Sequence, residues 1–221
     1  MQLTIDHSIF ICCLTIENED LMITATTNDM ALTSNSDQAV MWFKNKIKKV
    51  YNITNLGDLH WFLGMEIKHD CAACTITINQ SAYIKGMATK FGLTSTKPIY
   101  VPMLHDEILS HDQLPSMLAQ ATKMSKIPYL IGHVLWPVMI SHPDTVFTTG
   151  ILSQFILNPG PTYVKALKCL ISYLYTMQNC WLMFGGQNAK VLMYTDANYT
   201  QQADCHSISG YCLIFGAGAI S

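Results

Sequence analysis

The chain has 221 residues, of which 50% are hydrophobic and 13% are charged, so the composition excludes a largely disordered protein and allows one large domain or two small ones. The formal net charge is −2 and all thirteen basic residues are lysines, which argues against a protein that grips nucleic acid tightly through many phosphate contacts. No stretch is apolar for long enough to span a membrane, and residues 1–30 show no signal-peptide pattern, so we expect an intracellular protein.

The N-terminal part predicts two strands, a turn and a helix. The strands are expected within residues 3–16 and at 21–25, and the turn at 26–30. A helix is expected over residues 37–51, with Asp37 as its cap. Its apolar face would carry Val40, Phe43, Ile47 and either Val50 or Tyr51. The same helix carries a basic run made of Lys44, Lys46, Lys48 and Lys49, which indicates either a solvated face or a phosphate contact.

Residues 56–68 have the pattern of a tight hairpin or corner. Gly57 and Asp58 indicate a turn, and alternation from Leu59 onward predicts a half-buried strand as far as residue 68. Gly64 within that strand indicates a bulge or a close approach of another backbone. Residues 75–79 are expected to pair with this strand across a loop at 71–74. Cys71 and Cys74 in that loop have metal-ligand spacing, but no second Cys/His pair follows, so a zinc site is not expected.

Helices dominate the next part of the chain. Residues 80–91 predict a helix that Gly92 ends, and residues 94–125 predict a linker broken by prolines. A helix over residues 126–140 should be kinked or ended by Pro137. A further helix begins at Pro143 and runs to about residue 157, and residues 158–161 form a stop. Residues 162–177 predict an amphipathic helix, whose buried side is expected to carry Val164, Leu167, Leu170, Ile171 and Leu174. Short strands are expected at residues 181–184, 191–195 and 207–215, the first of them beside the other two.

The segment Leu-Gly-Asp-Leu-His-Trp-Phe-Leu-Gly-Met-Glu-Ile-Lys at residues 56–68 resembles a segment of copia-type retrotransposon reverse transcriptases. Further blocks resemble the same family in the same order, at residues 78–83, 98–103, 131–132, 142–144, 152–155, 158–159, 194–197 and 206–211. The resemblance implies an α+β fold with partial palm hairpins, a helical thumb and connection region, and the opening strands of a ribonuclease H fold. It implies a division into residues 1–104 (palm and start of the thumb), 105–125 (linker), 126–180 (helical connection) and 181–221 (start of ribonuclease H).

The resemblance places the polymerase metal hairpin at residues 26–30, where the family carries two adjacent aspartates. Here Asp29 is retained and Asn28 replaces the first aspartate. The family uses Mg²⁺, which prefers charged oxygen ligands, and a two-metal site needs several carboxylates. The further palm carboxylate of the family precedes the first residue of this sequence. We therefore expect no productive Mg²⁺ binding and no polymerisation.

The resemblance assigns the remaining sites in the same way. Asp196 corresponds to the first metal-binding carboxylate of ribonuclease H, and the later carboxylates lie beyond residue 221, so cleavage is not expected. Trp61 and Gly64 belong to the element that positions the primer end, and with the four lysines of residues 44–49 they are the expected nucleic-acid contacts. The implied partner is a primer–template duplex of RNA or DNA, bound weakly, with no small-molecule cofactor and no membrane.

Several departures from the family share one direction. Family arginines correspond to His142, Cys169, Ser172 and Cys205 here, and a family aspartate corresponds to Asn28. C-to-T transitions convert arginine codons to cysteine codons, and the same change on the other strand converts arginine to histidine and aspartate to asparagine. The first hypothesis is therefore a decayed, inactive reverse transcriptase–ribonuclease H fragment. The second is a retained module, without catalysis, that binds nucleic acid or a protein, and the third is an enzyme completed by another chain.

Overall fold

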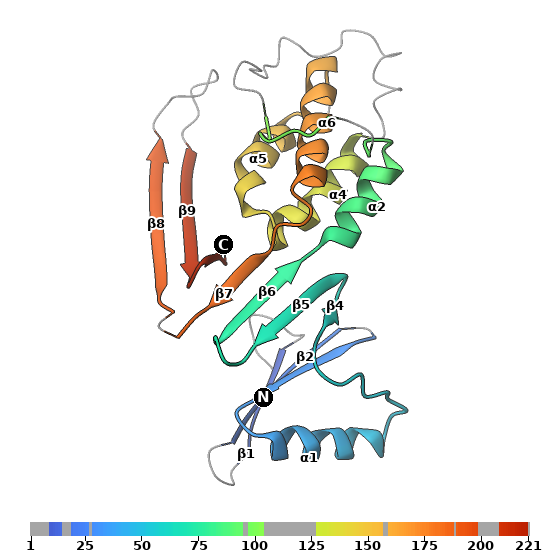
Figure 1. The fold of residues 1–221 in the computed structure, drawn as a ribbon, viewed down its shortest axis with the longest axis vertical. Coiled ribbons are helices and arrows are strands. Elements are labelled where there is room, and N and C mark those ends of the chain that lie inside the picture. Colours follow the sequence, from blue (N-terminus) through green and yellow to red (C-terminus); the bar gives the residue numbers. More distant parts are fainter. Residues whose placement is uncertain are drawn as a thin grey trace. The chain divides into compact units, whose positions relative to one another are not determined.

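The computed structural model describes residues 9–14, 19–26, 28–94, 97–103, 127–156, 159–187, 189–198 and 208–220, and it has the expected α+β composition (Figure 1). The chain divides into two compact units, Met1–Phe62 and Leu63–Ser221. The linker expected at residues 105–125 lies outside the described residues. Among the helices that the structure describes, none combines the length and the hydropathy needed to cross a membrane.

Unit 1 contains an antiparallel three-stranded sheet and one helix. Strands β1 (Ile9–Leu14), β2 (Glu19–Ala25) and β3 (Met30–Ser34) follow one another in the sheet, and helix α1 (Asp37–Lys48) packs against it. Leu21 and Ala39 are the most buried side chains, at 0% and 1% exposure. The two predicted strands, the turn after them and the helix are confirmed.

The ends of α1 differ from the prediction. Ser36 caps the helix, because its Oγ accepts a hydrogen bond from the Ala39 amide at 3.4 Å, and Asp37 is the first helical residue. A serine with extended backbone just before the first turn is the better acceptor for these free amides. The helix ends at Lys48, so Val50 and Tyr51 lie beyond it and are 73% and 65% exposed.

The strand expected over residues 59–68 is interrupted, so that prediction is wrong. Strand β4 (Trp61–Phe62) ends at a turn in which Leu63 and Gly64 both have positive φ, at 51° and 79°. Gly64 is therefore a turn residue and neither a bulge nor a point of close approach, since a Cβ built on it would meet nothing within 4 Å. Regular alternation begins only at Met65, which is buried together with Ile67.

The first sheet of unit 2 is antiparallel and pairs strands that are far apart in the chain. Strands β5 (Met65–Asp70) and β6 (Thr75–Asn79) form the predicted hairpin, and β7 (Leu182–Gly185) pairs with β6. The Asn79 amide nitrogen donates to the carbonyls of Gln178 and Cys180 at 3.1 and 2.7 Å, which ties the chain before β7 to the end of β6. This tie explains why residues 181–184 pair with β6 and form no ladder with β8 or β9.

The last strands form a second small sheet in unit 2. β8 (Val191–Asn198) pairs with β9 (Ile208–Phe215), and β9 pairs with β10 (Gly218–Ala219), a strand that the sequence pattern did not predict. β10 lies against β7, where a Cβ on Gly218 would collide with the Met183 carbonyl oxygen. A Cβ on Gly216 would likewise collide with the Gly185 carbonyl oxygen. The contact between β7 and the β9–β10 corner therefore requires glycine.

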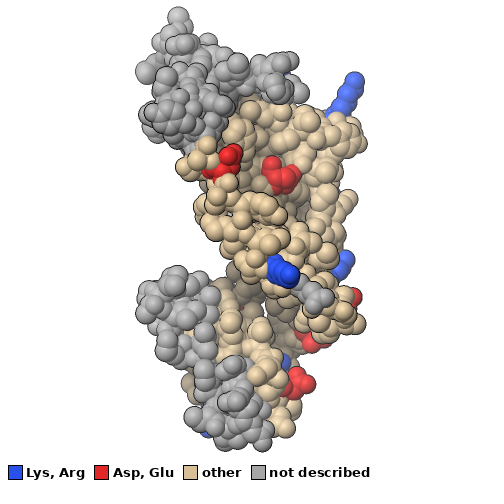
Figure 2. Space-filling model, turned by 90° about the vertical axis from the view of Figure 1, so that its left-hand side faces the viewer, with Lys and Arg blue, Asp and Glu red and all other residues tan. Residues whose placement is uncertain are grey.

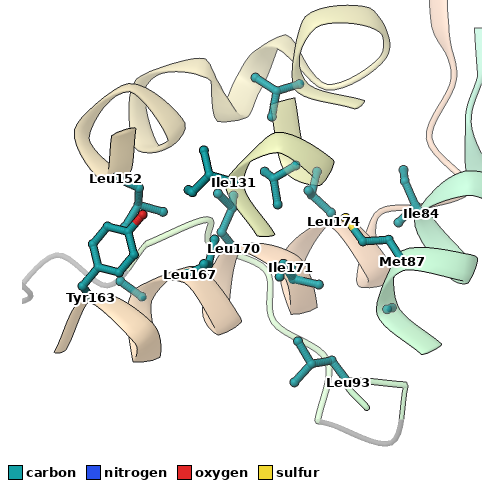
Figure 3. Packing of buried hydrophobic residues seen from close by; sticks show 14 of the residues in the cluster. Ile84, Met87, Leu93, Ile131, Leu152, Tyr163, Leu167, Leu170, Ile171 and Leu174 are labelled. Atoms are coloured by element: carbon teal, nitrogen blue, oxygen red, sulfur yellow. The ribbon is translucent and has the colours of Figure 1, made fainter. Parts of the chain in front are cut away.

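The helices of unit 2 enclose the main hydrophobic core (Figure 3). They are α2 (Ser81–Lys90), α4 (Ile127–Ile140), α5 (Val146–Gln154) and α6 (Pro161–Thr176), with the 3-10 turn η2 (Pro143–Thr145) before α5. The predicted buried face of α6 is confirmed, since Leu167, Leu170 and Leu174 are at most 1% exposed. Pro161 does not stop a helix but starts α6, because a proline at the first helical position gives up no hydrogen bond.

Pro137 does not end α4, which continues for three residues to Ile140. A proline inside a helix leaves the carbonyl four residues earlier without its amide donor. That carbonyl belongs to His133, and it accepts a hydrogen bond from the Tyr83 hydroxyl of α2 at 3.1 Å. A side chain fifty residues away thus replaces the lost backbone donor and keeps the helix intact.

Candidate functional site

The hairpin between β2 and β3 carries Asn28 and Asp29 at its turn. The Thr26 amide donates to the Asp29 carbonyl at 2.8 Å, and the Asp29 amide donates to the Thr26 hydroxyl at 3.2 Å. These bonds hold the Asp29 backbone, while the side chains of Asn28 and Asp29 are exposed. The turn therefore presents one carboxylate and one neutral amide to solvent.

A cavity of about 520 Å³ lies beside this turn, within unit 1. Its walls are the turn itself, one side of α1, and residues 52–62, which run from α1 to the end of β4. Of the residues that the sequence singled out, the cavity brings together Asn28, Asp29, Lys44, Lys48 and Trp61. The expected nucleic-acid contacts thus fall into two groups, those that line this cavity and those that do not.

Only two of the four lysines of α1 and its C-terminal end line the cavity, because the four side chains lie on different sides of the helix. Lys44 and Lys48 are four residues apart and line the cavity, as one helical face requires. Lys46 and Lys49 do not line it, and the Lys46 ammonium lies 5.9 Å from the centroid of the Trp42 ring instead. On the face of the molecule drawn in Figure 2, the described acidic and basic residues are separated by uncharged surface and form no basic patch.

Two further predicted residues lie outside the cavity. Gly64 belongs to unit 2, in the turn before β5. Asp196 lies in β8 opposite Gly210 of β9 and is exposed, also in unit 2. Asp29 and Asp196 therefore occupy separate compact units and separate hairpins.

The donor set of the cavity does not fit a two-metal centre. Asp29 and Asp58 are its carboxylates, and Asn28 adds a single neutral oxygen. Such a centre needs carboxylates that bridge or flank two cations. Within the described parts of the chain, no three His, Cys, Asp or Glu side chains are grouped so that they could hold a metal ion.

Sequence reasoning missed two cavity residues, Asp58 and His60. It assigned Asp58 to a turn and His60 to a strand, but both line the cavity next to Trp61. Their position depends on the path of residues 52–60, which have no regular secondary structure. The signal that could have found them is their place within the segment that resembles the reverse transcriptases.

A buried polar cluster in unit 2 was also missed. The His142 side chain is 3% exposed, and its Nδ1 lies 3.6 Å from Asp144 Oδ1. The Tyr173 hydroxyl donates a hydrogen bond to Asp144 Oδ2. Burial alone would raise the pKa of Asp144, but the neighbouring His142 ring and the hydrogen bond from Tyr173 outweigh it and lower that pKa. This cluster joins η2 and the residue before it to α6.

Comparison with known proteins identifies relatives among reverse transcriptases and transposon proteins. Residues 2–105 match the family described as Reverse transcriptase (RNA-dependent DNA polymerase). The chain is 27% identical over 208 residues to a retrovirus-related Pol polyprotein from transposon TNT 1-94 of Nicotiana tabacum, and the match covers 93% of this chain but 16% of the polyprotein. It is 22% identical over 203 residues to a putative transposon Ty5-1 protein of Saccharomyces cerevisiae, covering 91% of this chain and 64% of that protein.

A shorter relative matches part of the chain. The secreted RxLR effector protein 161 of Plasmopara viticola is 33% identical over 102 residues, which are 44% of this chain and 72% of the effector. No solved structure matches the chain significantly.

The fold and the site define an α+β protein in which a hairpin turn with an acidic residue faces lysines and a tryptophan across one cavity. The comparisons assign residues 2–105 to the reverse transcriptase family, and the chain resembles Pol polyproteins of copia-type transposons. It spans about a sixth of the tobacco polyprotein that it resembles.

Proposed function

We propose that this chain is a portion of a copia-type reverse transcriptase that does not polymerise DNA. The observation that carries the proposal is the turn of the β2–β3 hairpin, where Asn28 stands beside Asp29. A neutral amide oxygen is a poorer ligand for Mg²⁺ than a carboxylate, and a lone carboxylate cannot stabilise both the attacking and the leaving oxygen through two cations. The proposal places the chain inside the cell, in the cytoplasm or the nucleus.

Primer extension tests this proposal directly. The purified chain, given Mg²⁺ and a primed RNA template, should incorporate no more nucleotide than the Asp29→Ala variant. Asn28→Asp alone should also remain at background, because two adjacent aspartates are still not the carboxylate set of a two-metal site. Metal-dependent incorporation above the Asp29→Ala control would overturn the proposal.

The β8–β9 hairpin is, in the same proposal, the opening of a ribonuclease H fold with Asp196 as its first carboxylate. Support comes from the antiparallel pairing of the two strands and from the position of Asp196 in mid-hairpin, opposite Gly210. Residues 126–180 are then the helical connection between the polymerase part and this hairpin. Wild type and Asp196→Ala should leave the RNA strand of an RNA–DNA hybrid equally intact, and cleavage by the wild type that Asp196→Ala lacks would overturn the proposed absence of activity.

A second candidate function is weak binding of nucleic acid at the cavity of unit 1. The favouring observation is that Lys44, Lys48 and Trp61 line one cavity, combining phosphate partners with an aromatic ring on which a base can stack. Trp61 is 55% exposed and so is accessible from solvent.

Two double variants with the same change in charge separate this candidate from non-specific attraction. Lys44→Ala/Lys48→Ala removes the cavity lysines, and Lys46→Ala/Lys49→Ala removes two lysines of α1 outside the cavity. Binding to a primer–template duplex should weaken in the first variant, and its log–log salt slope should fall by about 0.9 per lost phosphate contact. The second variant should bind nearly as wild type. Equal losses in the two variants would show that the cavity does not direct the binding.

A further inference from the structure

The tip of the β5–β6 hairpin holds two thiols that the proposed function does not use. β5 ends at Asp70 and β6 begins directly after Cys74, so Cys71 and Cys74 are the outer residues of a four-residue turn. Asp70 Oδ1 accepts hydrogen bonds from the amides of Ala72 and Ala73, both at 3.0 Å. The turn is therefore held from within and keeps its two ends in place.

The turn brings the two cysteines within reach of a disulfide. The ends of a β-turn lie less than about 7 Å apart between Cα atoms, and disulfides span Cα separations of about 4.4–6.8 Å. Cys74 Sγ lies 3.6 Å from the Cys71 carbonyl oxygen, so this thiol points back across the turn. Both cysteines are free and exposed. The separation expected across the turn therefore falls within the range that a disulfide spans.

A base lies beside the first thiol. His69 lies near the end of β5, two residues before Cys71. Cys71 Sγ is 3.8 Å from His69 Nδ1 and 4.0 Å from His69 Nε2. The nucleophile in thiol chemistry is the thiolate, and an imidazole at this distance can accept the thiol proton.

The hairpin tip also lines a hollow that could admit a small oxidant. This hollow has a volume of about 330 Å³, and its walls are His69, the two cysteines, Ile76, Phe184, Gly185 and Phe215. Two thiols suffice for a disulfide, whereas a structural metal site needs a larger set of donors. The arrangement therefore favours redox chemistry over metal binding.

We propose that Cys71 and Cys74 form a redox-active dithiol that a low-molecular-weight disulfide oxidises to an intramolecular disulfide. The Cys71 thiol passes its proton to His69 and attacks one sulfur of the oxidant, and the other half leaves as a thiolate that takes up this proton. Cys74 loses its proton to solvent and attacks the Cys71 sulfur, which releases the second half of the oxidant as a thiolate that is protonated in turn. Two protein thiols are oxidised and one disulfide is reduced to two thiols.

Oxidation of the full chain by glutathione disulfide tests this proposal. The reduced protein is incubated with the oxidant, free thiols are alkylated, and the digested peptides are weighed by mass spectrometry. The peptide with Cys71 and Cys74 should lose two hydrogen atoms and carry no glutathione. Cys180, a free and exposed thiol of the same chain, should carry only a glutathione adduct. In Cys74→Ser the adduct on Cys71 should persist, because no second thiol displaces it.

The pH dependence of the oxidation rate shows whether His69 acts as a base or only supports the turn. His69→Gln should slow the oxidation on the order of tenfold at pH 7 and leave the rate at pH 9 unchanged, because ordinary thiols ionise without help at high pH. Separate glutathione adducts on Cys71 and Cys74 in the wild type would overturn the proposal, as would a disulfide from either of them to Cys180. An unchanged rate for His69→Gln at pH 7 would overturn the role of His69.

Discussion

The hydrogen bond from Tyr83 to the His133 carbonyl should stabilise unit 2 more strongly because Pro137 is present. Tyr83→Phe removes the donor at 3.1 Å and leaves a partly buried carbonyl without a partner. A neutral hydrogen bond contributes about 1 kcal/mol and an unpaired buried acceptor costs a further 1 kcal/mol or so, which together give about 2 kcal/mol. In a domain of this size that loss lowers the Tm by about 4–8 °C.

Pro137→Ala supplies the test, because an alanine at this position restores the amide that donates to the His133 carbonyl. In the Pro137→Ala background, Tyr83→Phe should therefore cost only about 1 kcal/mol, and the coupling between the two changes should be about 1 kcal/mol. Urea unfolding followed by circular dichroism on the four proteins of this cycle gives each free energy of unfolding. Tyr100→Phe, at a side chain that is 73% exposed, is the matched control and should change stability by less than about 0.5 kcal/mol. Equal costs of Tyr83→Phe in the two backgrounds would refute the compensation.

Three more predictions concern stability in unit 2. Leu170→Ala, at a fully buried side chain, should lower the free energy of unfolding in urea by about 2–5 kcal/mol. Leu135→Ala, at a side chain of α4 that is 41% exposed, should lower it much less. Similar losses in the two variants would contradict the described core. The pKa of Asp144 is lowered in the folded state, so the charged side chain stabilises the fold fully above its ordinary pKa, and this stabilisation is lost as pH falls through the folded-state pKa. The difference in free energy of unfolding between wild type and Asp144→Asn should therefore shrink on acidification. A difference that is constant with pH would argue against the cluster. β8 should exchange amide hydrogens faster than α6, because Val191 and Met193 are 61% and 63% exposed while α6 lines the core, and strong protection of β8 would mean that something covers it.

Local patterns in the sequence predict much of the fold. The spacing of Leu167, Leu170 and Leu174 predicts α6 and its buried face, and the alternation around Met65 and Ile67 predicts β5. Both signals arise because one side of each element must leave water. The hairpin partners β5 and β6 follow in the same way, since they are joined by a short turn.

The failures of sequence reasoning share a different cause, since each depends on a distant or irregular segment. Pro137 stays inside α4 because Tyr83, fifty residues earlier, provides the missing donor. β7 joins β6 because Asn79 binds carbonyls about a hundred residues later. Asp58 reaches the cavity along a stretch without regular structure, where no periodicity indicates direction.

The contacts of Gly216 and Gly218 with β7 make the β9–β10 corner sensitive to mutation. Every glycine codon begins with GG, so a G-to-A transition turns it into a codon for serine, arginine, aspartate or glutamate. At Gly216 or Gly218 any of these would place a Cβ against the backbone or ring of β7. The leucines and isoleucines of the helical core more often remain hydrophobic after such transitions. Copies of the retrotransposon that accumulate such transitions should therefore lose the packing of the β9–β10 corner on β7 first and keep the helical core longest.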